Sequence, residues 1–133
     1  MNDQPDNAPV VLFVDDEGGV RRASAKVMKQ AGYQVLEAGT AEEAQKVIES
    51  YTDAIDVLIM DINLPDGWGS AVAQRLVESH PEMVVVYTTG YADSDPILSS
   101  ALNDAPYVLR KPFSSEDLLN VLEEARRRGG RPR

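Results

Sequence analysis

Four apolar runs in the chain lead directly into side chains that can bind a cation or a phosphoryl group. The first run ends at Asp15 and Asp16, the second at Asp61, the third at Thr89 and the fourth at Lys111. When such runs are parallel strands of an open sheet, their carboxyl ends line one crevice in which ligands bind. Three acids, a hydroxyl and an amine at that edge are suited to a divalent cation and a phosphoryl group.

The three aspartates predict a site for a hard divalent cation. Carboxylates that lie within a few ångströms repel one another, and a bound cation relieves the repulsion. Magnesium prefers oxygen ligands in octahedral geometry. The histidine and cysteine ligands that zinc or copper favours are missing from these strand ends. We therefore expect Mg²⁺, or Mn²⁺ in its place.

Asp61 differs from the other two acids because it stands alone at the end of a middle strand. A carboxylate can attack phosphorus and form an aspartyl phosphate, in a reaction that depends mostly on positioning and charge neutralisation. We expect Lys111 to cover one phosphoryl oxygen, and the Thr89 hydroxyl with nearby backbone N–H groups to cover another. Singly, such residues are more often helix caps, turn formers or surface residues, so the prediction rests on their conjunction.

Composition limits the class of protein. The 133 residues are enough for one domain with one core, and a hydrophobic content of 43% is ordinary for a globular chain. The net charge of −9 argues against general affinity for nucleic acid. The sequence has no cysteine, no apolar stretch long enough to cross a bilayer and no secretory signal. We therefore expect a cytoplasmic protein with neither a membrane nor a nucleic-acid partner.

Alternating β-like and helical patterns predict an α/β fold, built from βαβ units around a parallel sheet with helices on both faces. Capping boxes at Thr40–Glu43 and Ser114–Asp117 predict where two helices begin, and a short helix is expected within 91–104. The expected strands are 10–14, 33–38, 56–61, 83–87 and 107–110. The expected organisation is a disordered lead-in at 1–8, one domain at 9–128 and a basic tail at 129–133.

Taken together, the motifs resemble the receiver domain of bacterial two-component response regulators, over about residues 9–128. The spacing agrees as well, because Thr89 lies 28 residues after Asp61 and Lys111 lies 22 residues after Thr89. The motifs that carry the resemblance are Asp15-Asp16-Glu17, Asp61 followed by Asn63 and Pro65, Thr89-Gly90, and Lys111-Pro112-Phe113.

The resemblance implies a flavodoxin-like doubly wound (βα)5 sandwich whose parallel strands lie in the order 2-1-3-4-5. It also implies a switch in which Asp61 accepts a phosphoryl group from a histidine kinase or a histidine phosphotransfer protein, with Mg²⁺. The modified domain then changes its contacts with a downstream protein that the sequence does not identify. Such a domain is not an enzyme, beyond catalysing its own phosphorylation and dephosphorylation.

The same likeness implies a ligand set for the metal. Asp16 and Asp61 bind the ion directly, Asp15 acts mainly through a metal-bound water, and the backbone carbonyl of Asn63 completes the protein ligands. The Lys111–Pro112 peptide bond is expected to be cis, which aims the amine into the crevice.

One position departs from the family's pattern. Receivers usually carry an aromatic residue three positions before the lysine, but that position here is Val108. The aromatic residue, Tyr107, lies one position earlier and so on the opposite face of the strand. We therefore expect activation to be weaker than usual or to take another route.

Two alternative functions can be weighed against the switch. A receiver-like interaction module that works without phosphorylation would not need the full set of acids, threonine and lysine. A haloacid-dehalogenase-like phosphatase needs a second acid two residues after its nucleophile, where this chain has Asn63. The basic residues of the first helix are either kinase-docking residues, by family likeness, or a solvated face: Arg21, Arg22 and Lys26.

Overall fold

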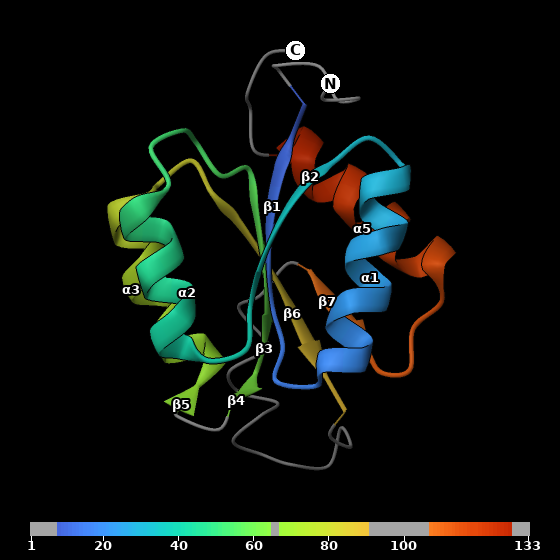
Figure 1. Cartoon of the computed structure of the whole chain (residues 1–133), viewed down its shortest axis with the longest axis horizontal. Coiled ribbons are helices and arrows are strands. Elements are labelled where there is room, and N and C mark those ends of the chain that lie inside the picture. The colour runs from blue at the N-terminus through green and yellow to red at the C-terminus, as the bar shows by residue number, and fades with distance from the viewer. Residues whose placement is uncertain (1–7, 65–66, 91–106, 129–133) are drawn as a thin grey trace.

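One parallel sheet organises the molecule (Figure 1). The computed structural model describes residues 8–64, 67–90 and 107–128. Five parallel strands lie in the order β2-β1-β3-β6-β7, which confirms the predicted order 2-1-3-4-5 along the chain. The strands are β1 (Val10–Val14), β2 (Gln34–Ala38), β3 (Val57–Asp61), β6 (Val84–Thr89) and β7 (Val108–Arg110).

Helices cover both faces of this sheet, as predicted. Figure 1 shows α1 and α5 on one face and α2 and α3 on the other. The described helices are α1 (Gly18–Gln30), α2 (Ala41–Ser50), α3 (Gly69–Ser79) and α5 (Ser115–Arg128). Ala8, the last residue of the expected lead-in, is buried. The rest of that lead-in, the helix expected within 91–104 and the tail expected at 129–133 lie outside the described residues.

The core lies on both sides of the sheet because successive side chains of a strand point to opposite faces. Every residue of β1 and of β3 is buried, as expected for central strands that helices cover on both sides. Leu12 packs in a cluster with α2 and α3, and its neighbour Phe13 packs in a second cluster with α1 and α5. The two central strands are therefore held from both faces, and their carboxyl ends open at one edge.

Strand β6 extends further than the sequence predicted. The expected strand ended at Tyr87, but β6 continues through Thr88 and Thr89. Pairing accounts for the extension, because Thr88 is in register with Asp61 of β3 and Thr89 is in register with Arg110 of β7. Both threonines therefore belong to the carboxyl end of β6 and not to the loop that follows this strand.

A short hairpin follows β3. Its strands β4 (Asn63–Leu64) and β5 (Gly67–Trp68) are antiparallel, and Leu64 pairs with Gly67. The sequence indicated a turn from Leu64 to Gly67, and the pairing of these two residues agrees with it. The hairpin connects the end of β3 directly to α3.

The predicted caps begin two helices, with one difference in detail. Before α5, Ser114 Oγ accepts from the Asp117 N–H at 3.0 Å and Asp117 Oδ2 accepts from the Ser114 N–H at 3.3 Å, which confirms the capping box. Before α2, Thr40 Oγ1 accepts from the Glu43 N–H at 3.1 Å. The Glu43 carboxylate, however, accepts from the N–H of Gly39 at 2.6 Å. Gly39 is the residue before the cap, whereas a capping box would use the N–H of Thr40 itself.

The cap before α5 gives a test of local stability. Ser114→Ala removes the acceptor for the Asp117 N–H and should lower the free energy of unfolding by about 1 kcal/mol, measured by urea denaturation. Ser115→Ala is the matched control, because Ser115 is exposed and already part of the helix. That control should stay within about 0.5 kcal/mol of the parent chain, and equal losses in the two variants would contradict the cap.

Candidate functional site

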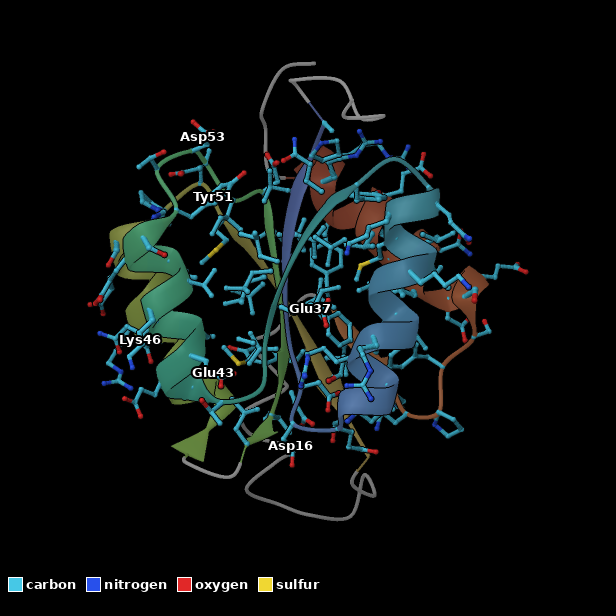
Figure 2. The ribbon with its side chains drawn as sticks, viewed as in Figure 1. Asp16, Glu37, Glu43, Lys46, Tyr51 and Asp53 are labelled. Carbon is cyan, nitrogen blue, oxygen red and sulfur yellow. The ribbon has the colours of Figure 1, made fainter. Side chains whose placement is uncertain are left out.

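Three aspartates converge at the carboxyl ends of two neighbouring strands. Asp15 and Asp16 follow β1 directly, and Asp61 is the last residue of β3. Each offers one carboxylate oxygen, and these oxygens lie within 4.8 Å of one another. Asp15 and Asp61 are buried, whereas Asp16 is exposed. Figure 2 shows Asp16 at the edge of the sheet where the strands end.

Lys111 brings a positive charge among these acids. Its Nζ contacts three carboxylates, at 2.8 Å from Asp15 Oδ2, 2.9 Å from Asp61 Oδ2 and 3.1 Å from Glu17 Oε1. One ammonium is therefore shared by acids from the ends of two strands and from the residue before α1.

The backbone of β7 positions this ammonium. The Lys111 N–H donates to the carbonyl of Thr89 at 2.8 Å, just beyond the paired residues of β6 and β7. The next peptide bond, Lys111–Pro112, is cis, as the resemblance to receivers implied. Sheet pairing thus brings the lysine to the same edge as the acids.

The contacts also set the protonation state of Lys111. Burial by itself would lower its pKa, but hydrogen bonds to Asp15 and Asp61, together with their negative charges, outweigh burial and raise the pKa well above its ordinary value. The ammonium therefore stays positive across the physiological range and offsets the repulsion among the acids.

Both threonines at the end of β6 lie against the strands that carry the charged groups. The carbonyl of Thr88 accepts from the N–H of Ile62, the residue after Asp61, at 3.0 Å. The side chains of Thr88 and Thr89 are buried. The hydroxyl of Thr88 has no hydrogen-bond partner in the part of the chain that the structure describes. The choice of Thr89 as the phosphoryl ligand stays a prediction.

Asn63 is the remaining residue of the expected ligand set. It lies two residues after Asp61, as the first residue of β4, and pairs with Trp68 of β5. Its backbone is thus part of the hairpin that begins two residues after the acid Asp61. Its role as a metal ligand stays a prediction.

The two residues before Leu109 differ in their surroundings. Tyr107 is only 6% exposed and packs in the core cluster with α1 and α5. Val108 is half-buried and in register with Tyr87 of β6. Because residues in register share a face of a parallel sheet, the aromatic side chain beside Val108 comes from the neighbouring strand. Burial raises the pKa of this Tyr87 phenol.

Sequence reasoning missed the contacts of two residues at this edge, Glu17 and Arg21. Glu17 contacts Lys111, and the available signal was its place as the third of three consecutive acids. Arg21 was expected to be either a kinase-docking residue or part of a solvated face, but most of its side chain is covered, and its guanidinium bonds to the backbone of Asp15 and to Glu37 of β2. A docking role for Arg21 stays a prediction. No sequence pattern indicated the contact between Arg21 and Glu37, since it joins a helix and a strand whose relative placement only the fold defines.

The fold and this arrangement of acids and lysine define a receiver domain of two-component response regulators. The chain matches the response regulator receiver domain family over residues 11–123, and it belongs to that family. The match begins in β1 and ends in α5, so it includes every strand of the parallel sheet. The family and the fold expected from the sequence are both confirmed.

Similar proteins differ in how much of their length the domain occupies. The response regulator receiver protein CpdR of Brucella abortus is 31% identical over 120 residues, which cover 86% of this chain and 93% of CpdR. The sensor kinase CckA of the same organism is 30% identical over 115 residues, but the match covers only 12% of that protein. A crystal structure of a CheY-like receiver domain protein from Methanospirillum hungatei has a TM-score of 0.81 at 27% identity, covering 92% of this chain and 97% of that one.

A helix that spans a membrane must be long and apolar. None of the described helices is both long enough and apolar enough to span a bilayer.

The shared ammonium gives a prediction about stability and pH. Lys111→Met leaves the carboxylates without their common cation and should lower the free energy of unfolding in EDTA by about 2 kcal/mol, less than for a fully buried pair because water reaches the ammonium. The raised pKa means that the contribution of Lys111 is present below the ordinary lysine pKa and is lost only as pH rises through the raised value. The deficit measured by urea denaturation should therefore be constant from about pH 6 to about pH 9.

Lys46→Met is the matched control for this experiment. Lys46 is 72% exposed and pairs at 3.5 Å with Glu42 on the surface of α2; Figure 2 shows it on the outer side of the helix. Its loss should change the free energy of unfolding by less than about 0.5 kcal/mol. An equal effect of the two substitutions would contradict the role given to Lys111.

Proposed function

We propose that Asp61 accepts a phosphoryl group from a histidine kinase or a histidine phosphotransfer protein in a Mg²⁺-dependent reaction, and that the modified domain switches its contacts with other proteins. One observation carries the proposal: Asp61 meets two further acids and the ammonium of Lys111 at a single edge of the sheet. Under this proposal the chain is a signalling domain and not an enzyme with a separate substrate.

Asp61 is the nucleophile of the proposed reaction. One of its carboxylate oxygens forms a bond to phosphorus, the bond from phosphorus to the donor atom breaks, and the donor leaves with the electron pair. Lys111 already contacts Asp61 at 2.9 Å and would neutralise a phosphoryl oxygen, while Thr89 would donate its hydroxyl to another. Positioning and charge neutralisation of this kind account for most of the catalysis of phosphoryl transfer.

The donor set fits Mg²⁺, with Mn²⁺ as a substitute. The three convergent acids offer only oxygen ligands, one of them on the exposed Asp16, and Mg²⁺ favours a few carboxylates together with waters. We assign Asp16 and Asp61 as direct ligands, Asp15 as a ligand through water, and the backbone carbonyl of Asn63 as the remaining protein ligand. When bound, the ion would neutralise negative charge on the phosphoryl oxygens.

A hollow beside Lys111 supports the approach of a protein donor. It has a volume of about 500 Å³ and lies between α1 and the segment that follows β7. Apolar side chains supply much of its lining, with Val20 from α1 and Phe113 after the cis peptide, and Glu17 carries a charge there. Because Lys111 lines the hollow and also contacts Asp61, a side chain that entered here would come close to the nucleophile. One relative with a similar segment is named a sensor kinase, which agrees with a place in kinase signalling.

Phosphorylation by a small donor tests the proposal. Incubation with acetyl phosphate and Mg²⁺ should add one phosphoryl group to the parent chain, measured by intact mass. Asp61→Asn should add none, because the amide nitrogen and oxygen do not replace a carboxylate as the nucleophile. Replacement of Mg²⁺ by EDTA should suppress the gain in the parent chain.

Asp53→Asn is the matched control, because Asp53 is an exposed aspartate at the opposite end of the molecule (Figure 2). This variant should gain the phosphoryl group as the parent does. A gain that persists in Asp61→Asn would contradict the assignment of the acceptor, and no gain in the parent would contradict the proposed function. Turnover of p-nitrophenyl phosphate by the parent chain would instead favour a phosphatase.

A further inference from the structure

Arg21 holds the loop that carries the two consecutive aspartates. Its Nη1 donates to the backbone carbonyl of Asp15 at 2.8 Å, and its Nε lies 3.3 Å from Oε1 of Glu37 on β2. The Arg21 side chain is only 21% exposed, so most of it is covered by its neighbours. Figure 2 shows Glu37 on β2, next to α1. One guanidinium therefore joins α1, β2 and the loop after β1.

The carbonyl that Arg21 binds controls the next residue. It belongs to the same planar peptide unit as the N–H of Asp16, so fixing the carbonyl fixes the direction in which the chain enters Asp16. The N–H of Asp15 is fixed as well, by the carbonyl of Ala38 at 3.1 Å. Asp16 itself is exposed. Packing does not hold its side chain, and its distance from Asp61 depends on the backbone of this loop.

Space for the guanidinium comes from Gly39, directly after β2. A Cβ at this position would lie 3.1 Å from Nη1 of Arg21, closer than side chains ordinarily pack. The N–H of Gly39 is bonded to Glu43 of α2, so the turn that borders Arg21 is itself fixed. The guanidinium is thus enclosed by the ends of two strands and is not simply resting on a surface.

We infer that Arg21, oriented by Glu37, is a positioning residue that holds Asp16 where it can share a divalent cation with Asp61. The inference rests on the cation site proposed above and extends it to a residue that touches neither a metal nor a phosphoryl group. Arg21 is positively charged, so its charge alone would oppose the binding of a cation. By holding Asp16 in place, however, Arg21 would strengthen cation binding. The effect of its charge and the effect of its contacts on cation affinity are therefore opposite and can be separated.

The effects of charge and of position are separated by the Mn²⁺ affinity of the full chain. This affinity is measured from the free-ion signal in electron paramagnetic resonance. Arg21→Gln should weaken Mn²⁺ binding by about 10-fold, as expected for residues that orient metal ligands, whereas loss of charge alone would tighten it. Arg22→Gln is the matched control, because it removes the same charge from the next residue, which is exposed. Its affinity should be unchanged or slightly higher.

Arg21→Lys separates charge from geometry. Lysine keeps the positive charge but lacks the planar fork that lets one side chain donate to Asp15 and to Glu37 at once. This variant should therefore also bind Mn²⁺ more weakly than the parent, and it carries the test if Arg21→Gln does not fold. The half-saturating Mg²⁺ concentration for phosphorylation by acetyl phosphate should rise in both variants, while the rate at saturating Mg²⁺ stays within about twofold of the parent.

The outcomes distinguish this inference from the proposed function. If both Arg21 variants bind Mn²⁺ as tightly as the parent while Asp61→Asn does not, Arg21 has no positioning role and the proposed function stands. If Asp61→Asn binds Mn²⁺ like the parent, or if the parent binds none, the cation site is wrong and the role of Arg21 fails with it.

Discussion

Repulsion among carboxylates at one edge of the sheet is the constraint on which the rest of the structure depends. Three acids place oxygens within 4.8 Å of one another, and two of them are buried, where water screens their charges least. The ammonium that offsets them reaches the site from β7, and its backbone N–H is bonded to β6. The pairing of β6 with β7 therefore supplies the counter-charge, so the site depends on the register of these two strands as well as on that of β1 and β3.

Under the proposed function, Lys111 would compete with a divalent cation for the same carboxylates. Its Nζ contacts oxygens of Asp15 and Asp61, both of which belong to the cluster that would hold the ion. Under the proposed function, a phosphoryl group on Asp61 would add negative charge there and give the ammonium a new partner, while the acids would be the residues that hold the ion. Lys111 would then exchange a carboxylate partner for a phosphoryl oxygen, which is also negatively charged and also favours the ammonium form.

Much of this edge could be predicted from the sequence, because strand ends are readable from apolar runs and parallel strands end on the same side. That argument gives Asp15, Asp61 and Lys111 their common edge. It does not give contacts that depend on how far a strand extends or on how a helix lies across the sheet. β6 continues past Tyr87 because its last residues pair with both neighbouring strands, which local propensity does not encode. Arg21 meets Glu37 only once α1 lies over β2, so composition alone made Arg21 one basic surface residue among several.

The departure at Val108 has a structural consequence on the same edge. Tyr87 and Thr89 are two residues apart on β6 and so share a face of the sheet, and Val108 is in register with Tyr87 on that face. Tyr107 faces the other side and is fixed in the core with α1 and α5. Under the proposed function, a movement of Thr89 would bear on the face that holds Tyr87 and Val108. Valine has no ring to rotate, so on this face of β6 and β7 the aromatic side chain is that of Tyr87, on the strand that carries the threonine itself.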